Sequence, residues 1–277
     1  MKSKELNVLK SGCFVNEDRS NAGARATQAH VVRPQEARAQ ARQAHQDVTA
    51  YLRHMEHRIL HLVGERGVLG QWLVTLFPEE KVDYLLALYR VGALPDGRTV
   101  FPYLTRSGFP VDAKVMAYGP DGHRVKASPL PSPEGKGEGV RVTWLHVLDR
   151  LERPMSLPLF GEELLGTLPF APLCLVESEK TALVAKLWRP DCTWIATGGK
   201  SSFTADRCRV LAGRTVLVWP DADAVGEWME TAATIGPALD IRFQFPTAYL
   251  NRIREGPPKD DLADMIVRTL RCRTLCS

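Results

Sequence analysis

The pattern of apolar and polar residues changes character along the chain. The segment 1–45 shows no apolar period and is rich in Ala, Gln, Arg and Asn, which predicts a mobile extension. Apolar residues then recur at helical spacing over Val48–Val63 and predict the first ordered helix. Two more helices are expected, one over Val68–Phe77 and one that begins at Pro78 and ends before Gly92.

A β-rich pattern follows these helices. The runs Arg98–Leu104 and Val111–Tyr118 are separated by Arg106-Ser107-Gly108, so they predict consecutive antiparallel strands. The Pro- and Gly-rich segment Ser128–Gly139 predicts a surface loop.

From residue 172 onward, short apolar strands alternate with helices. The expected strands are Leu173–Val176, Thr193–Thr197, Thr215–Trp219 and Ile241–Phe245, and the expected helices are Lys180–Arg189, Ala205–Ala212, Ala224–Ile235 and one from about Leu262. This alternation predicts right-handed βαβ units and a parallel sheet. Sites in such sheets lie at the carboxyl ends of the strands.

Charged and flexible residues stand at those strand ends. The first strand is followed by Glu177, the second by Gly198-Gly199-Lys200, and the third by Asp221 and Asp223. The two aspartates are two residues apart, so in extended backbone they are expected to point the same way. A shared edge with several carboxylates is a natural site for Mg²⁺.

Each feature also has a structural interpretation. Asp223 could cap the helix that starts near Ala224, and the acids of the segment 260–264 could cap the last helix. The Gly198-Gly199 pair could simply form a tight turn. Their coincidence at three consecutive strand ends favours a functional edge.

Four motifs together resemble a toprim domain, the catalytic module of bacterial-type primases, topoisomerases and related nucleases. They are Val176-Glu177-Ser178-Glu179-Lys180-Thr181-Ala182-Leu183, Ala196-Thr197-Gly198-Gly199-Lys200, Val218-Trp219-Pro220-Asp221-Ala222-Asp223-Ala224-Val225-Gly226 and Lys259-Asp260-Asp261-Leu262-Ala263-Asp264. The segment 98–118 resembles the β-rich lobe that precedes this domain in primases. Residues 65–270 are similar to an uncharacterised family of bacterial primase-like proteins.

The resemblance implies an α/β fold: a toprim (Rossmann-like) parallel sheet with flanking helices, preceded by a smaller α+β lobe. The expected division is a basic extension at 1–45, a helical segment with a β-rich lobe at 46–160, and a toprim-like domain at 161–277.

The resemblance also implies a Mg²⁺- or Mn²⁺-dependent, primase-like nucleotidyltransferase that acts on single-stranded DNA in the replication or mobilisation of a mobile element. The expected partners are single-stranded DNA, nucleotides and a helicase or other replication protein. The expected catalytic residues are Glu177, Asp221 and Asp223, the expected metal ligands are these three with Asp264, and the expected substrate-binding residues are Lys114, Lys200, Gly198, Gly199 and Arg98.

Several departures leave alternatives open. Thr181 stands where primases commonly carry an acid, Ser178 replaces a common glycine, and Cys13 has no neighbours with which to build a zinc ribbon. A non-catalytic, nucleic-acid-binding accessory protein with the toprim fold fits these departures. A haloacid-dehalogenase-type phosphatase is a third possibility, with Asp221 as the nucleophile and Asp223 as the general acid.

Charge and composition narrow the setting. Residues 1–66 carry 11 Lys and Arg against 7 acids, so the whole net charge of +4 belongs to this quarter of the chain. This charge predicts a tether for DNA or a partner. No apolar run approaches the ~18 residues that span a bilayer, no secretory pattern is present, and the six cysteines form no CxxC pair. A cytoplasmic location without membrane contact is expected.

Overall fold

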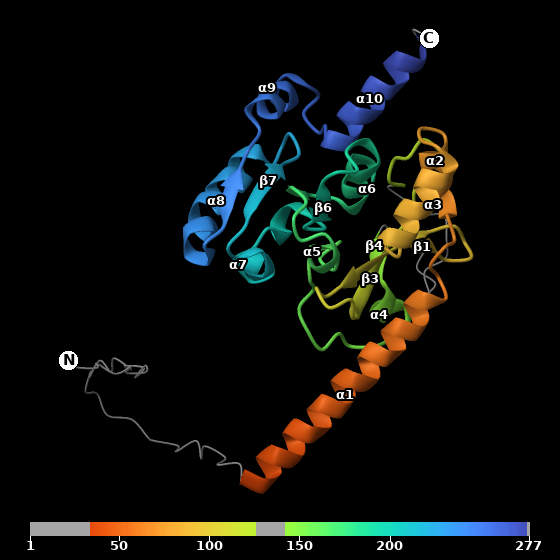
Figure 1. The fold of residues 1–277 in the computed structure, drawn as a ribbon. Coiled ribbons are helices and arrows are strands. Elements are labelled where there is room, and N and C mark those ends of the chain that lie inside the picture. The colour runs from red at the N-terminus through yellow and green to blue at the C-terminus, as the bar shows by residue number, and fades with distance from the viewer. Residues whose placement is uncertain (1–33, 126–141, 276–277) are drawn as a thin grey trace, which may run out of the picture. The chain divides into compact units, whose positions relative to one another are not determined.

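Residues 34–125 and 142–275 are described in a computed structural model of the chain (Figure 1). The chain divides into a unit of residues 1–43 and a larger compact unit of residues 44–277. The second unit carries both sheets. The predicted loop at 128–139 and residues 1–33 of the predicted extension lie outside the described residues.

Helix α1 (Pro34–Leu60) begins well before Val48, so the prediction that residues 34–45 are unstructured is wrong. The segment lacks an apolar stripe, but Ala, Gln and Arg are strong helix formers and propagate the helix toward its N-terminus. The predicted buried stripe is confirmed, because Tyr51, Met55 and Ile59 are all buried.

The first sheet is antiparallel and has the order β1-β2-β3-β4. Its strands are β1 (Gly92–Ala93), β2 (Thr99–Leu104), β3 (Pro110–Met116) and β4 (Val142–Trp144), and its helices are α2 (Gly67–Val74), α3 (Glu79–Leu88) and α4 (Leu145–Leu148). The antiparallel pairing of β2 with β3 confirms the predicted hairpin.

The second sheet is parallel and has the order β6-β5-β7-β8. Its strands are β5 (Leu173–Val176), β6 (Thr193–Ala196), β7 (Thr215–Trp219) and β8 (Arg242–Gln244). The predicted α/β class with a parallel sheet and flanking helices is therefore confirmed. In the register of this sheet, Val176 pairs with both Ala196 and Trp219, so these three strands end at one level.

Helices cover both faces of the parallel sheet. They are α5 (Leu164–Thr167), α6 (Glu179–Trp188), α7 (Ala205–Cys208), α8 (Val225–Leu239), α9 (Thr247–Glu255) and α10 (Leu262–Leu275), with short 3₁₀ turns at Lys200–Ser202 and Arg209–Leu211. Helix α9 was not predicted, because six of its nine residues are polar or small and leave only a narrow apolar stripe. Among the described residues, none of the helices has the length and apolar character needed to cross a membrane.

Successive side chains of the central strand β5 belong alternately to two hydrophobic clusters. Cys174 and Val176 belong to the cluster shared with α6 and α10, whereas Leu173 and Leu175 belong to the cluster shared with α8. All four side chains of the strand are buried, as expected for a parallel strand covered on both faces.

Aromatic packing connects the two sheets. Phe160 pairs with Ala196 beside β6 through two backbone hydrogen bonds of 2.9 and 3.0 Å. Its ring lies 5.8 Å from that of Phe101 and 6.0 Å from that of Tyr103, both on β2. The antiparallel sheet is thereby held against the strands that carry the predicted site.

Candidate active site at the carboxyl edge of the parallel sheet

A cavity of about 720 Å³ lies at the carboxyl edge of the parallel sheet. It is lined by Lys114, Met116, Tyr118, His123, Arg124, Val125, Glu177, Ser178, Glu179, Lys180, Gly198, Gly199, Asp221, Lys259 and Asp261. The predicted site residues Glu177, Asp221, Lys114, Gly198 and Gly199 are among them. The structure thus gathers carboxylates and cationic side chains from both sheets around one space.

Glu177 and Asp221 form the acidic floor of this cavity. Oε2 of Glu177 and Oδ1 of Asp221 are both buried and have no hydrogen-bond partner. Burial, followed by the negative charges of Asp261 and Glu177, raises the pKa of Asp221 to about 9. Burial and the charge of Asp223 raise the pKa of Glu177 as well. The floor therefore brings together two carboxyl groups whose charged forms the protein itself does not stabilise.

Asp261 is a further cavity residue that the prediction did not single out. Its Oδ2 accepts a hydrogen bond of 2.9 Å from the hydroxyl of Thr181, and its side chain is buried. Primases commonly carry an acid at the position of Thr181. Here Thr181 instead orients the carboxylate of Asp261. The available signal was helix capping: Asp261 directly precedes α10, so its carboxylate stays at the start of that helix.

Asp264, predicted as a metal ligand, does not line the cavity. Its backbone N–H donates to Oδ1 of Asp261 at 2.8 Å, and its own carboxylate accepts from the N–H of Asp261 at 3.4 Å. This reciprocal pattern is a capping arrangement at the start of α10. Lys180 Nζ lies 3.9 Å from the other carboxylate oxygen of Asp264. The geometry therefore supports a capping role for Asp264 at the start of α10, and not a role as a metal ligand.

Asp223 and Asp221 do not share a direction. The side chain of Asp223 is 56% exposed and is absent from the cavity lining. The expectation assumed extended backbone, but the chain turns here, and the N–H of Ala224 donates to the carbonyl of Asp221 at 2.9 Å. Asp223 does not cap α8 either, because no side chain caps that helix.

Lys200 and Arg98 also lie outside the cavity lining. Lys200 Nζ donates to the carbonyl of Asp223 at 2.6 Å and lies 3.5 Å from a carboxylate oxygen of Glu227. Arg98 donates to the carboxylate of Asp96 at 2.8 Å, just before β2. The structure therefore does not bring these two predicted substrate contacts to the acidic floor.

The Gly198 turn depends on glycine. Gly198 has φ +78°, and a Cβ at this position would lie 2.1 Å from the hydroxyl oxygen of Tyr103. Its N–H donates to the carbonyl of Glu177 at 2.8 Å. The turn is thus linked directly to the backbone of an acidic floor residue.

A divalent cation fits only part of the predicted ligand set. Within residues 34–125 and 142–275, no three His, Cys, Asp or Glu side chains lie close enough to form a metal site. The predicted set of Glu177, Asp221, Asp223 and Asp264 therefore does not form one ligand group, because Asp223 is exposed beside Lys200 and Asp264 is engaged at the start of α10. Mg²⁺ commonly uses one or two carboxylates with water and substrate phosphates. The two unpartnered oxygens of Glu177 and Asp221 fit that smaller requirement.

The raised pKa of Asp221 predicts how stability depends on pH when no divalent cation is present. The folded state binds the proton of Asp221 more tightly than the unfolded state, so stability falls as pH rises from about 4 to about 9. Asp221→Asn should remove this slope and add at least about 1.4 kcal/mol of stability at pH 9, which corresponds to one pKa unit. Urea unfolding at several pH values, in the presence of a chelator, measures the free energy of unfolding of both proteins and its slope with pH. An identical slope in wild type and variant would show that Asp221 is not the titrating group.

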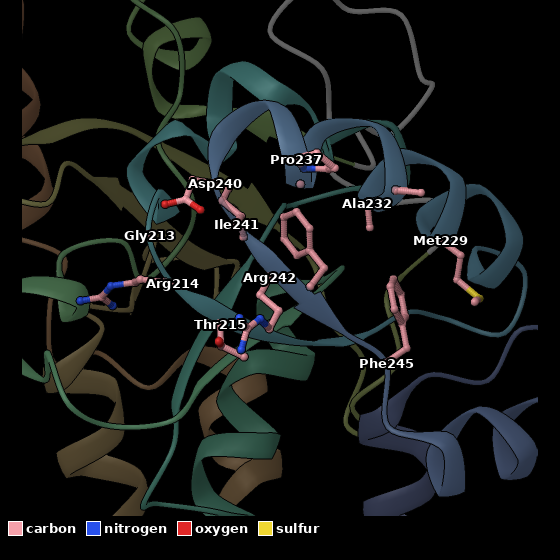
Figure 2. Close-up of a pocket in the computed structure, with 13 residues that line it drawn as sticks. Gly213, Arg214, Thr215, Met229, Ala232, Pro237, Asp240, Ile241, Arg242 and Phe245 are labelled. Atoms are coloured by element: carbon pink, nitrogen blue, oxygen red, sulfur yellow. The ribbon is translucent and has the colours of Figure 1, made fainter.

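A second cavity, of about 760 Å³, lies beside α8 and β8 (Figure 2). Figure 2 shows that its lining comes from the start of β7, from α8 and from β8, including Arg214, Met229 and Phe245. Asp240 is its only acidic lining residue, and none of the predicted site residues contributes to it. Two arginines, Arg214 and Arg242, also line it, but it has no group of carboxylates for a cation.

Solved structures of primases are similar to this chain at low identity. The primase fragment of the bacteriophage T7 primase-helicase protein is 16% identical, with a TM-score of 0.41, and the match covers 70% of this chain and 69% of that one. A DnaG primase catalytic domain bound to single-stranded DNA is 15% identical, with a TM-score of 0.48 and coverage of 82% and 78%. A DnaG catalytic core is 16% identical, with a TM-score of 0.46 and coverage of 82% and 79%.

Comparison with curated proteins gave no match. One protein-family model matches residues 68–222, which is more than half of the chain and includes β1 to β7 together with Glu177, Gly198 and Asp221. The chain therefore belongs to the family described as Domain of unknown function (DUF6371).

Proposed function

We propose that this chain is a divalent-cation-dependent, primase-like nucleotidyltransferase that acts on single-stranded DNA. The observation that carries the proposal is the pair of buried, unpartnered carboxylate oxygens on Glu177 and Asp221. Both residues line a cavity of about 720 Å³ whose wall also includes Arg124, Lys180 and Lys259. Carboxylates for a cation and cationic side chains for phosphates are the two requirements of phosphoryl transfer.

In the proposed mechanism, Asp221 and Glu177 would hold Mg²⁺ or Mn²⁺. The cation, when bound, supplies charge stabilisation for the transferred phosphoryl group. Asp261, oriented by Thr181, adds negative charge next to Asp221 and strengthens cation binding. Arg124 and Lys259 bind phosphate oxygens at the wall of the cavity. Glu177 would also accept the proton of an attacking sugar hydroxyl.

The biological setting follows from the motif resemblance. We propose a cytoplasmic protein of replication or mobilisation of a mobile element, with a helicase or other replication protein as a partner. The basic excess of residues 1–66 supports a tether for DNA at that end. The division at residues 45 and 160 remains a prediction.

One observation favours a second candidate, a nucleic-acid-binding accessory protein without catalysis. The described residues contain no group of three His, Cys, Asp or Glu side chains that could hold a metal ion by themselves. The phosphatase hypothesis is not proposed. It requires Asp221 and Asp223 at one reacting centre, and Asp223 is exposed beside Lys200 instead.

The test is nucleotide transfer by the full chain on single-stranded DNA, with ribonucleotides or deoxynucleotides and Mg²⁺ or Mn²⁺. The proposal predicts new phosphodiester products that require the cation and disappear in a chelator. Asp206→Asn, an exposed carboxylate on α7 away from the cavity, is the matched control and should leave the products unchanged. Salt-dependent DNA binding with no product under any condition would favour the accessory protein.

A further inference from the structure

Lys114 is predicted to bind nucleotide phosphates, but its ammonium group is already engaged inside the protein. Lys114 Nζ lies 3.0 Å from Oε1 of Glu179 and donates to the carbonyl of Gly198 at 2.7 Å. The lysine is 8% exposed and Glu179 only 1%. A buried ion pair with this geometry does not release its lysine easily, because either charge alone would be poorly solvated.

Two other side chains complete this buried cluster. The hydroxyl of Tyr103 donates to the same Oε1 of Glu179 that Lys114 contacts. The guanidinium of Arg207 lies 5.8 Å from the centre of the Tyr103 ring and donates to the carbonyl of Thr197. Tyr103 and Lys114 come from β2 and β3, whereas the other members belong to the parallel sheet and its helices. The cluster therefore ties the two sheets together under the Gly198 turn.

The cluster leads to the acidic floor by a short path. Lys114 holds the carbonyl of Gly198, and the N–H of Gly198 holds the carbonyl of Glu177 at 2.8 Å. The hydroxyl of Thr197 also contacts the carbonyl of Glu177, at 3.3 Å. Displacing the turn would therefore displace the backbone that carries Glu177.

We infer that Lys114, Glu179 and Tyr103 form a clamp that positions the Gly198 turn and, through it, Glu177. Lys114 is thus a positioning residue and not a phosphate ligand. Its role in placing a cation ligand rests on the proposed function, whereas its role in fixing the turn does not. A contact of this kind would orient a metal ligand without touching the metal.

The alternative role of Lys114 makes opposite predictions. If Lys114 bound substrate phosphate, Glu179→Gln would free it from its ion pair and lower the KM for nucleotide. Lys114→Met would then raise the KM and leave cation affinity unchanged. The clamp predicts instead that both variants impair the turn and the cation site, with the KM for nucleotide little changed.

Lys186 provides a matched control for Lys114 and lies on α6, the helix that carries Glu179. It is buried to a similar degree, with 7% exposure, and donates to the carbonyls of Pro190 and Cys192 at 2.7 and 2.8 Å. It lies in the last turn of α6, whereas Glu179 lies in the first. Lys186→Met therefore removes a comparable buried cation away from the Gly198 turn.

The experiment is amide hydrogen exchange of the segment 196–203 combined with Mn²⁺ titration, in the full chain. Glu179→Gln and Lys114→Met should each speed exchange of the turn about tenfold and weaken Mn²⁺ binding by about 10-fold or more. Lys186→Met should change neither. The double variant Lys114→Met/Glu179→Gln should recover part of the thermal stability, because neither Lys114 nor Glu179 is left as a charge without its partner. It should not recover Mn²⁺ affinity, because the Gly198 carbonyl still lacks its donor.

Two results would overturn the clamp. One is unchanged exchange of the turn in both single variants, and the other is equal acceleration in Lys186→Met. If the double variant recovers both thermal stability and Mn²⁺ affinity, the ion pair of Lys114 and Glu179 only stabilises the fold and does not position Glu177. If the wild type binds no Mn²⁺ at all, the proposed function fails, while the exchange data still decide whether the clamp exists.

Discussion

Asp221→Asn is expected to reduce cation-dependent nucleotide transfer by about 100- to 1,000-fold, because a bound cation contributes several kcal/mol to the transition state. The substitution keeps the shape of the side chain and removes the negative charge that the cation needs. Burial raises the pKa of Asp221 to about 9, so the site already disfavours the charged carboxylate, and the neutral Asn variant should fold at least as stably as the wild type. Steady-state rates and thermal unfolding, measured on the same preparation, separate the two effects.

Asp223→Asn is the sharpest comparison for this loss. The two aspartates belong to one motif, but Asp223 is 56% exposed and lies 3.8 Å from Lys200 Nζ. We expect the Asp223 variant to lose about tenfold or less, as for a charge that acts through solvent. An equal loss in the two variants would contradict the assignment of the cation to Asp221 and Glu177.

Gly198→Ala is expected to destabilise the protein by about 2–5 kcal/mol, from the positive φ and from overpacking. The added Cβ would lie 2.1 Å from the Tyr103 hydroxyl and 3.2 Å from Oε1 of Glu179. The turn must therefore move, and cation-dependent activity should fall together with stability. Thermal unfolding measures the loss of stability, which lowers the Tm by about 2–4 °C for each kcal/mol in a chain of this size.

Gly213→Ala separates the two causes of that destabilisation. Gly213 has a similar φ of +75°, but an added Cβ would meet nothing within 4 Å. It should therefore show only the conformational cost, about 1 kcal/mol. Tyr103→Phe should partly rescue Gly198→Ala, because it removes the oxygen that the new methyl group meets. Equal destabilisation by the two glycine substitutions would show that contact with Tyr103 is unimportant.

The fold was largely predictable because its strands carry strong local signals. The four apolar runs of the parallel sheet stand out from the helices between them, and Leu173–Val176 was placed with its observed bounds. Helix α9 was missed because its buried residues, Tyr249, Leu250 and Ile253, are too few to form a clear stripe. The early start of α1 was missed because helix propensity alone extends it beyond its buried part.

The site was predictable only as far as strand ends define it. Glu177, Gly198 and Asp221 follow strands that end at one level, so sequence order was sufficient to bring them together. The direction of Asp223 depends on a turn, and the roles of Asp261 and Asp264 depend on which one caps α10. The engagement of Lys114 by Glu179 joins residues of two sheets, and no local pattern reveals such a contact.

The central claim is that Glu177 and Asp221 hold a divalent cation. Its most direct test is to measure Mn²⁺ binding to the metal-free full chain by electron paramagnetic resonance. If Glu177 and Asp221 hold a divalent cation, the wild type will bind Mn²⁺ at a site from which Mg²⁺ displaces it. Asp221→Asn will lose this binding, and Asp206→Asn will retain it. Wild-type protein that binds no Mn²⁺, or an Asp221→Asn variant that binds it as tightly as the wild type, would contradict the claim.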